Sequence, residues 1–91
     1  ESIIIDRVRI DDDGTHWIVD YKTSSHEGGS LEGFLGQEAE RYRPQLQKYA
    51  TIYKNLTRAK VRTALYFPLL REFYEVEIVK LKLFPSGMFV L

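Results

Sequence analysis

Apolar and polar residues alternate in two stretches near the start of the chain. The first stretch runs from Ser2 to Ile10 and the second from Thr15 to Thr23. Side chains alternate faces along a β-strand, so this period of two predicts two strands. The intervening Asp-Asp-Asp-Gly at 11–14 ends in Asp-Gly, which is typical of a tight hairpin turn. We therefore predict that the two strands pair as a β-hairpin.

The middle of the chain changes from a glycine-rich segment to a helical pattern. Ser24–Gly36 holds four of the six glycines, which predicts a mobile loop without strand or stable helix. Gln37–Arg43 is polar and fits a short helical lead-in, and Pro44 either starts a helix or kinks one. Between Pro44 and Leu56 the apolar residues recur at intervals of three and four, which predicts an amphipathic helix.

Two further alternating stretches predict the remaining strands. Lys60–Pro68 reads as a third strand and Glu72–Leu83 as a fourth, followed by a turn at Pro85–Gly87. Met88–Leu91 is either a short last strand or a cut end. The order strand–strand–helix–strand–strand predicts an α+β fold, with one mixed sheet and the helix packed on one face.

Composition limits the chain to one domain and removes several classes of site. Ninety-one residues with 44% hydrophobic content support a single core, so residues 1–91 are expected to form one domain. The chain starts at Glu1 inside an apolar strand, so we expect it to be the C-terminal part of a longer protein. The absence of cysteine excludes disulfides, thiolate zinc sites and iron–sulfur clusters within these residues.

Charge and hydropathy add two expectations about the surroundings of the protein. The formal net charge is zero, so a nucleic-acid-binding face would have to be a local feature. No apolar run approaches the ~20 residues of a membrane span. We therefore expect a cytoplasmic protein that does not contact the membrane.

Three charged residues occupy unusual places in the first two strands. Asp6 lies inside an apolar run, and Asp20 and Lys22 lie at the end of the second one. Residues two apart in a strand share a face, and the hairpin would bring Asp6 within reach of Asp20. A carboxylate on a half-buried surface is costly unless it is paired, hydrogen-bonded or metal-bound. A metal ion would account for the cluster, and an ordinary ion pair at a strand end is the alternative.

Three ordered motifs resemble a known family. Ile-Asp-Arg-Val, Ile-Val-Asp-Tyr-Lys-Thr and Gln-Leu-Gln-Lys-Tyr-Ala are similar to the motifs of the PD-(D/E)xK nuclease superfamily. The sequence is most similar to the nuclease domains at the C-termini of the RecB and AddA helicase-nucleases, over Ile3–Phe67. The resemblance implies a restriction-endonuclease-like core. That core is partial here, because the family's upstream helix with its His or Glu ligand has no counterpart in the sequence.

The resemblance also implies a role for individual residues. Asp6 matches the first acidic metal ligand, Asp20 the acidic residue of the (D/E)xK element, and Lys22 its lysine. The backbone carbonyl of Tyr21 would be a further metal ligand. Mg²⁺ is the implied cofactor, with Mn²⁺ as a substitute, and hard oxygen ligands such as these suit both ions.

Four more residues are candidates for contacting DNA or supporting the site. Gln45 and Tyr49 match the family's helical Gln-x-x-x-Tyr motif and, four residues apart, share a helix face. Arg7 and Arg43 could contact phosphates, which dominate nucleic-acid affinity. As solvated surface charges, the two arginines would need no such role.

The sequence therefore predicts a metal-dependent DNA exonuclease domain that hydrolyses phosphodiester bonds. By resemblance, its partners are DNA and a helicase to which it is attached, and its process is double-strand-break repair and recombination. The alternative is a catalytically inactive nuclease-like domain that binds DNA or docks a partner.

Overall fold

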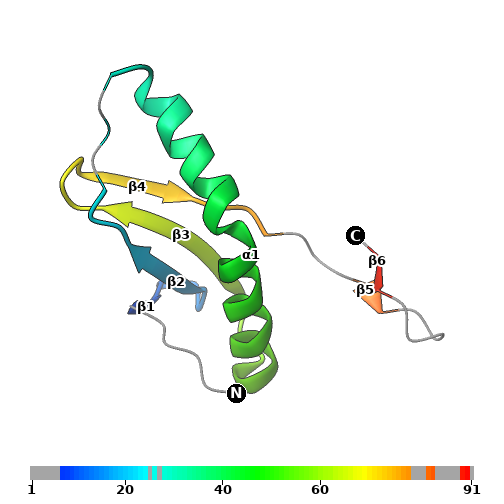
Figure 1. Ribbon diagram of the computed structural model, residues 1–91. Helices are drawn as coiled ribbons and strands as arrows, with labels where there is room; N and C mark the ends of the chain where they lie inside the picture. The colour runs from blue at the N-terminus through cyan, green and yellow to red at the C-terminus, as the bar shows by residue number, and fades with distance from the viewer. Residues whose placement is uncertain (1–6, 25, 27, 79–81, 84–88, 91) are drawn as a thin grey trace.

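The fold is a four-stranded sheet with one long helix, seen in a computed structural model of the chain (Figure 1). The structure describes residues 7–24, 26, 28–78, 82–83 and 89–90. The sheet has the order β1-β2-β3-β4. A two-stranded sheet follows it in the chain. The elements are β1 (Arg7–Ile10), β2 (His16–Tyr21), α1 (Leu31–Thr57), β3 (Val61–Phe67), β4 (Glu72–Glu75), β5 (Lys82–Leu83) and β6 (Phe89–Val90).

The predicted hairpin is confirmed. β1 and β2 pair antiparallel, with Arg7 opposite Val19. In the turn, the Gly14 amide donates to the Asp11 carbonyl at 3.0 Å. Gly14 has a φ of 86°, a left-handed conformation that glycine adopts without steric cost. The Asp13 carboxylate accepts from the Thr15 amide at 3.0 Å, so both backbone and side chain fix the turn.

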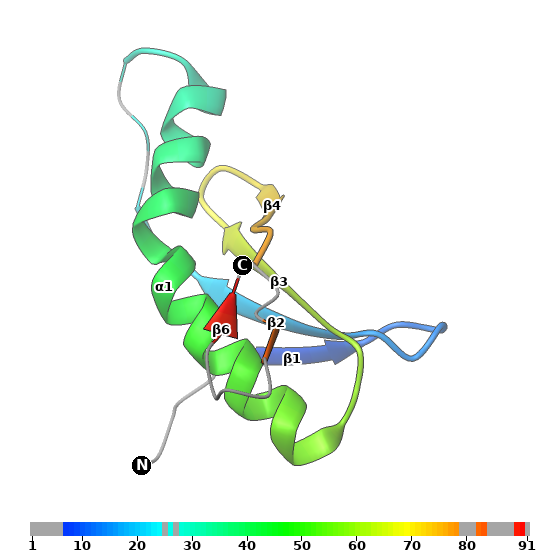
Figure 2. The same cartoon turned by 90° about the vertical axis from the view of Figure 1, so that its right-hand side faces the viewer.

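The helix α1 connects β2 to β3 and covers one face of the sheet. β2 and β3 are parallel, with Ile18 opposite Thr63, so the chain must cross over between them. Figure 2 shows α1 along one side of the sheet. The buried core lies between α1 and the strands and comprises Ile18, Leu35, Ala39, Leu46, Ala50, Leu65, Phe67 and Val76.

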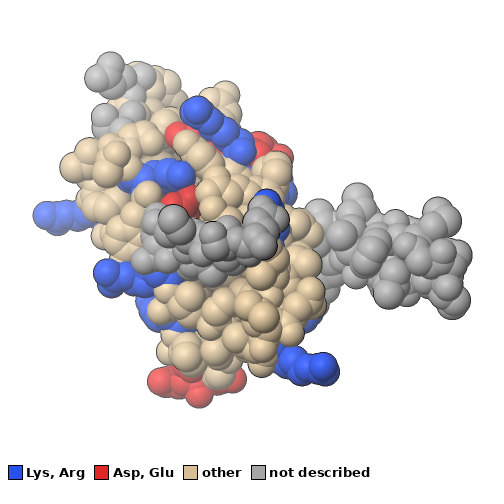
Figure 3. All heavy atoms as spheres, turned by 60° about the horizontal axis from the view of Figure 1, so that its bottom comes forward, with Lys and Arg blue, Asp and Glu red and all other residues tan. Residues whose placement is uncertain are grey.

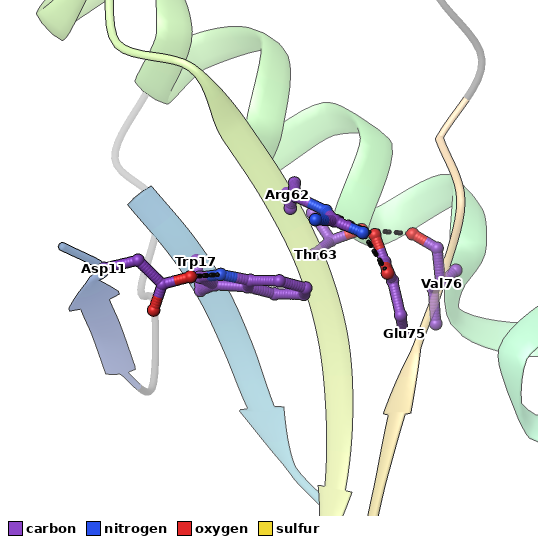
Figure 4. Close-up of polar contacts among 6 residues, drawn as sticks. All are labelled: Asp11, Trp17, Arg62, Thr63, Glu75 and Val76. Carbon is purple, nitrogen blue, oxygen red and sulfur yellow. Dashed lines mark hydrogen bonds and ion pairs between the residues drawn. The ribbon is translucent and has the colours of Figure 1, made fainter. Parts of the chain in front are cut away.

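The face away from α1 carries polar contacts between neighbouring strands. The Trp17 indole donates to Asp11 Oδ2 at 2.7 Å (Figure 4). The Arg62 guanidinium forms a two-point contact with Glu75, at 2.7 and 2.5 Å, and lies 4.6 Å from the centre of the Trp17 ring. Among the described elements, no helix covers this face.

The hydrogen bonding between β3 and β4 continues for one residue beyond β4, at Val76. β3 and β4 are antiparallel, with Ala64 opposite Glu75. The Val76 amide donates to the Thr63 carbonyl at 2.9 Å, and the Thr63 hydroxyl donates to the Val76 carbonyl at 2.6 Å (Figure 4). Thr63 and Val76 are both buried, so the two hydrogen bonds lie at the edge of the core next to β4.

The glycine-rich segment differs from its prediction. Residues 24–36 were expected to form a loop, but α1 begins at Leu31 and runs unbroken through Pro44. The Ser30 side chain caps the helix by accepting from the Gly33 amide at 3.2 Å. Capping and the burial of Leu35 compensate for the poor helix propensity of two glycines. The predicted amphipathic helix is thus the second half of a longer one.

Two other predictions need correction or lie outside the described residues. The fourth strand, expected over 72–83, ends at Glu75 as β4, and residues 76–78 are not strand. Lys82–Leu83 form a separate strand, β5, which pairs with β6. The turn expected at 85–87 lies outside the described residues. The short last strand expected within 88–91 is confirmed by β6.

Candidate active site

Asp20 and Lys22 lie at the end of β2, on the face that α1 covers. Ile18 packs in the core beneath the helix, and Asp20 and Lys22 follow it at steps of two along the strand. Lys22 Nζ lies 3.0 Å from Asp20 Oδ2, and the side chains are only 18% and 13% exposed. The predicted pair is therefore a nearly buried ion pair rather than a solvated one, and its geometry is more restricted than that of a surface pair.

Lys22 is fixed both through its backbone and through its side chain. Its amide donates to the Tyr66 carbonyl at 2.8 Å, which continues the pairing of β2 with β3 by one residue. Its ammonium lies over the ring of Tyr42, 3.6 Å from the centroid. The lysine thus bridges the end of the strand and the middle of α1.

A second contact shows how α1 runs relative to β2. The ring nitrogen Nδ1 of His16, at the start of β2, lies 2.6 Å from the Tyr53 hydroxyl near the end of α1. Because the end of β2 meets Tyr42, the helix runs antiparallel to the strand. From His16 to Asp20 the strand rises roughly 13 Å, which corresponds to about nine helical residues. Asp20 therefore lies level with the middle of α1, where Gln45 itself is exposed.

One stripe of α1 carries Tyr42, which contacts Lys22, together with the predicted Gln-x-x-x-Tyr residues. Glu38, Tyr42, Gln45 and Tyr49 follow one another at spacings of four, three and four, so they lie on one side of the helix. The Gln45 side-chain amide donates to the Tyr49 hydroxyl at 2.8 Å. The predicted Gln-x-x-x-Tyr residues are thus bonded to each other.

Glu38 and Tyr42 belong to the same stripe but were not among the predicted site residues. Glu38 is 8% exposed, and its carboxylate lies 3.9 Å from the Arg41 guanidinium. Tyr42 is partly buried and packs against the core cluster. Their spacing from Gln45 was the available signal, because residues three and seven positions before it share its side of a helix.

The structure places the other predicted site residues in different surroundings. Arg7 lies on the sheet face away from α1, 5.2 Å from the centre of the Tyr21 ring. Arg43 donates from Nε to the Glu77 carbonyl at 2.9 Å and pairs with Glu40. Asp6 lies outside the described residues.

The oxygen donors suit a hard divalent cation, although the described residues alone do not assemble a complete site. In the described part of the chain, no three His, Asp or Glu side chains gather closely enough to hold a metal ion. Asp20 supplies a carboxylate, the ligand type that Mg²⁺ and Mn²⁺ prefer. Its position at a strand end, on a face with little solvent, is compatible with a cation that keeps part of its water shell.

The segment between β2 and α1 borders a hollow of about 330 Å³. His26, Gly28, Gly29 and Phe34 are among the residues that line it. The His26 Nε2 lies 3.0 Å from the Gly29 carbonyl, and its ring packs 5.7 Å from that of Phe34.

The surface charge is mixed. In the view of Figure 3, Lys and Arg side chains appear at several separate places, with Asp and Glu side chains between and below them. This pattern agrees with the formal net charge of zero. Affinity for a polyanion would therefore come from a few local contacts rather than from the overall field.

The mixed sheet with one packed helix is an α+β fold of the restriction-endonuclease-like type, and comparison with protein families identifies the superfamily. The sequence matches the PD-(D/E)XK nuclease superfamily over residues 4–83. The chain belongs to this superfamily. A comparison with curated proteins finds no significant match. Within the described residues, no helix has the length and apolar character needed to cross a membrane.

Proposed function

We propose that the chain is a metal-dependent deoxyribonuclease domain that hydrolyses phosphodiester bonds in DNA. The observation that carries this proposal is the Asp20–Lys22 pair, which lies 3.0 Å apart and nearly buried at the end of β2. Membership of a nuclease superfamily supports the class of reaction. The acidic residue and the lysine of the family motif face the same helix, so both could act on one bound phosphate.

Asp6 is proposed as the second carboxylate of the site. The β1–β2 register ends with Arg7 opposite Val19. In an antiparallel ladder the next pair would join Asp6 and Asp20, and directly opposite residues point to the same face. The β1–β2 register therefore supports the prediction, made from the hairpin, that the two carboxylates meet. The Tyr21 carbonyl is proposed as a further ligand on family resemblance.

The proposed mechanism assigns separate tasks to the acid and the lysine. The chemistry that a bound Mg²⁺ or Mn²⁺ supplies is a lower pKa of coordinated water and compensation of charge on the phosphate. Asp20 and Asp6 would hold the cation. Lys22 donates to the phosphate oxygens or to the attacking water and stabilises the negative charge that develops in the transition state.

The finer assignment follows the family motifs. We propose an exonuclease of the RecB or AddA type, attached to a helicase, which processes double-strand ends in the cytoplasm during repair and recombination. Gln45 and Tyr49 would contact the DNA or support the catalytic residues, and Arg43 and Arg7 would contact phosphates. Arg7 would do so only on the far face of the sheet, because its side chain lies over Tyr21.

A catalytically inactive domain is the second candidate. The observation that favours it is the direct contact of Lys22 Nζ with Asp20 Oδ2 at 3.0 Å, which an ordinary ion pair also explains. In that case, Asp20 and Lys22 would be a structural ion pair, and the domain would bind DNA or a partner without cleaving.

Cleavage of DNA by Asp20→Asn separates the two candidates. The chain is incubated with Mg²⁺ and end-labelled double- and single-stranded DNA, beside the parent and Asp12→Asn. Asp12 is an exposed aspartate of the hairpin turn, so its variant makes the same chemical change away from the site. We expect Asp20→Asn to lose at least a hundredfold in rate, because a metal ligand is removed. Equal rates in the parent and Asp20→Asn would contradict the proposal, and no cleavage by the parent would favour the inactive domain.

Lys22→Ala tests the division of tasks. We expect its rate to fall by roughly two orders of magnitude, as for other positioned groups that stabilise transition-state charge. Its affinity for Mn²⁺ should stay close to that of the parent, measured by calorimetric titration. An unchanged rate would remove the catalytic role of the lysine, and lost metal binding would make Lys22 a structural support of the ligands.

A further inference from the structure

We propose that Tyr42 is a positioning residue for Lys22, because its ring face holds the lysine ammonium beside Asp20. The ammonium lies 3.6 Å from the ring centroid and 3.0 Å from Asp20 Oδ2. A cation over the face of an aromatic ring is attracted by the negative charge of that face. The inference rests on the proposed nuclease function, in which Lys22 acts on the phosphate.

Positioning is needed because a lysine side chain is flexible. It has four rotatable carbon–carbon bonds, and ordering it costs conformational entropy. The Lys22 amide donates a hydrogen bond to the Tyr66 carbonyl. This hydrogen bond fixes the backbone of the lysine but does not orient its ammonium. Asp20 alone would attract the charge from several rotamers. The ring selects those in which the ammonium lies between strand and helix.

Tyr42 is itself fixed by the helix. It is partly buried and packs against the core cluster, one turn before Leu46, which is fully buried. The ring therefore moves with α1 as a rigid part of the fold. One ring face is covered by the ammonium, so stacking on a DNA base through that face would require Lys22 to leave. The contact therefore favours a positioning role over base stacking.

The kinetic consequence is specific. Removing the ring should leave substrate binding unchanged and lower the fraction of molecules with a correctly placed ammonium, so kcat falls while KM stays constant. We expect Tyr42→Leu to lower kcat roughly tenfold, which is the scale of a partly desolvated cation–π contact. Tyr42→Phe keeps the ring and should keep the rate.

The experiment combines kinetics with a direct measurement of the contact. NMR spectra of the chain record the Lys22 side-chain ε-protons, which the Tyr42 ring current shifts upfield. The shift should be present in the parent and in Tyr42→Phe and be lost in Tyr42→Leu. Tyr53→Leu is the matched control, because Tyr53 is another partly buried tyrosine of α1 that contacts His16 instead of Lys22. It should keep both the Lys22 shift and the kcat of the parent.

A second variant covers the case in which Tyr42→Leu does not fold. A fluorinated phenylalanine at position 42 preserves the size of the ring but weakens its negative face. A lower kcat than that of Tyr42→Phe, with equal KM, would support positioning, because packing alone would not distinguish the two rings.

The possible failures are distinguishable. A Lys22 shift that survives in Tyr42→Leu, or a kcat equal to that of the parent when the shift is lost, would overturn the positioning role. If the parent cleaves no DNA while the shift disappears in Tyr42→Leu, the proposed nuclease function fails and Tyr42 is a structural contact only. Equal losses of kcat in Tyr42→Leu and Tyr53→Leu would also overturn the proposal, because they would indicate a general packing effect.

Discussion

The acidic side chains of this chain occupy distinct environments, and each environment sets what the group can do. Asp13 lies in the exposed hairpin turn and accepts from a backbone amide. Asp20 is nearly buried beside the Lys22 ammonium, and Glu38 is buried on the helix stripe that carries Tyr42. Asp13 affects only local stability, whereas Asp20 supplies a carboxylate that could bind a cation at the end of β2.

Asp13 provides a prediction about pH. The amide of Thr15, which donates to the carboxylate, lowers the pKa of Asp13 below its ordinary value. A folded-state pKa lower than the unfolded one means that the carboxylate stabilises the hairpin above pH ~4 and loses this effect as the pH falls through the lowered value. We expect Asp13→Ala to reduce Tm by a few degrees at pH 7. The difference should shrink toward zero near pH 2.

The measurement is Tm of the parent and of Asp13→Ala between pH 2 and pH 7. Asp12→Ala is the control, because Asp12 is its exposed neighbour in the same turn. A difference between the parent and Asp13→Ala that is constant over this pH range would show that the carboxylate charge is not responsible.

Of the two contacts that the Lys22 ammonium makes, the sequence predicted the one with Asp20 but not the one with Tyr42. Asp20 and Lys22 are two apart in a strand, so their shared face follows from the strand period alone. The contact of Lys22 with Tyr42 joins residues twenty positions apart. It depends on how far α1 is rotated about its own axis, which is decided by the packing of residues such as Leu46.

At the scale of the elements, the strands were predicted more reliably than the start of the helix. The turn signal at Asp13-Gly14 and the alternation of β3 are local, and both are confirmed. The first turns of α1 contain Gly33 and Gly36, which each disfavour a helix by about 1 kcal/mol relative to alanine. Tertiary packing of Leu35 and Phe34 against the core outweighs this preference.

Pro44 shows the same effect. Proline in the interior of a helix lacks an amide donor and clashes with the preceding turn, and the cost is about 3 kcal/mol. The sequence predicted that Pro44 would either start a helix or kink one. It lies within α1, two residues before Leu46, which has no exposed surface. The anchoring of the helix on both sides of Pro44 is a property of the sheet beneath it, which local reasoning does not include.

The strand β3 gives a testable prediction through Thr63. Its hydroxyl donates to the Val76 carbonyl at 2.6 Å in a buried position (Figure 4). Thr63→Val preserves the shape of the side chain but removes this donor. The variant should lose about 1–2 kcal/mol in the free energy of unfolding, because a buried hydrogen bond is lost while the volume is unchanged.

Chemical denaturation of the parent and Thr63→Val measures this loss. Thr51→Val is the control, because Thr51 is an exposed threonine of α1 whose hydroxyl donates to the Gln47 carbonyl within the helix. It should change the free energy of unfolding by less than about 0.5 kcal/mol. Equal changes in the two variants would show that the buried donor of Thr63 has no special weight.

At the scale of the whole molecule, the mixed sheet predicted from the sequence is confirmed, and the apolar residues of its edge strand β1 are exposed. Val8 and Ile10 share the face of Ile18, which is buried under α1. They are 38% and 61% exposed, because α1 lies over β2 and β3 instead. The position of a helix over particular strands is a global property. The geometry of the site depends on this position of the helix, because the Lys22 ammonium lies between β2 and α1.

The last prediction joins the proposed site to the stability of the whole domain. A cation that binds the folded chain and not the unfolded one stabilises it by about 2.7 kcal/mol at a concentration of one hundred times Kd. In a domain of this size, that corresponds to a rise in Tm of roughly 10–20 °C. We expect this rise in the parent and in Asp12→Asn when Mn²⁺ is added in thermal unfolding experiments. Asp20→Asn should show none, since it lacks the ligand charge at the end of β2. A similar rise in all three proteins would place the metal elsewhere on the chain, and the Asp20–Lys22 pair would then be a structural ion pair.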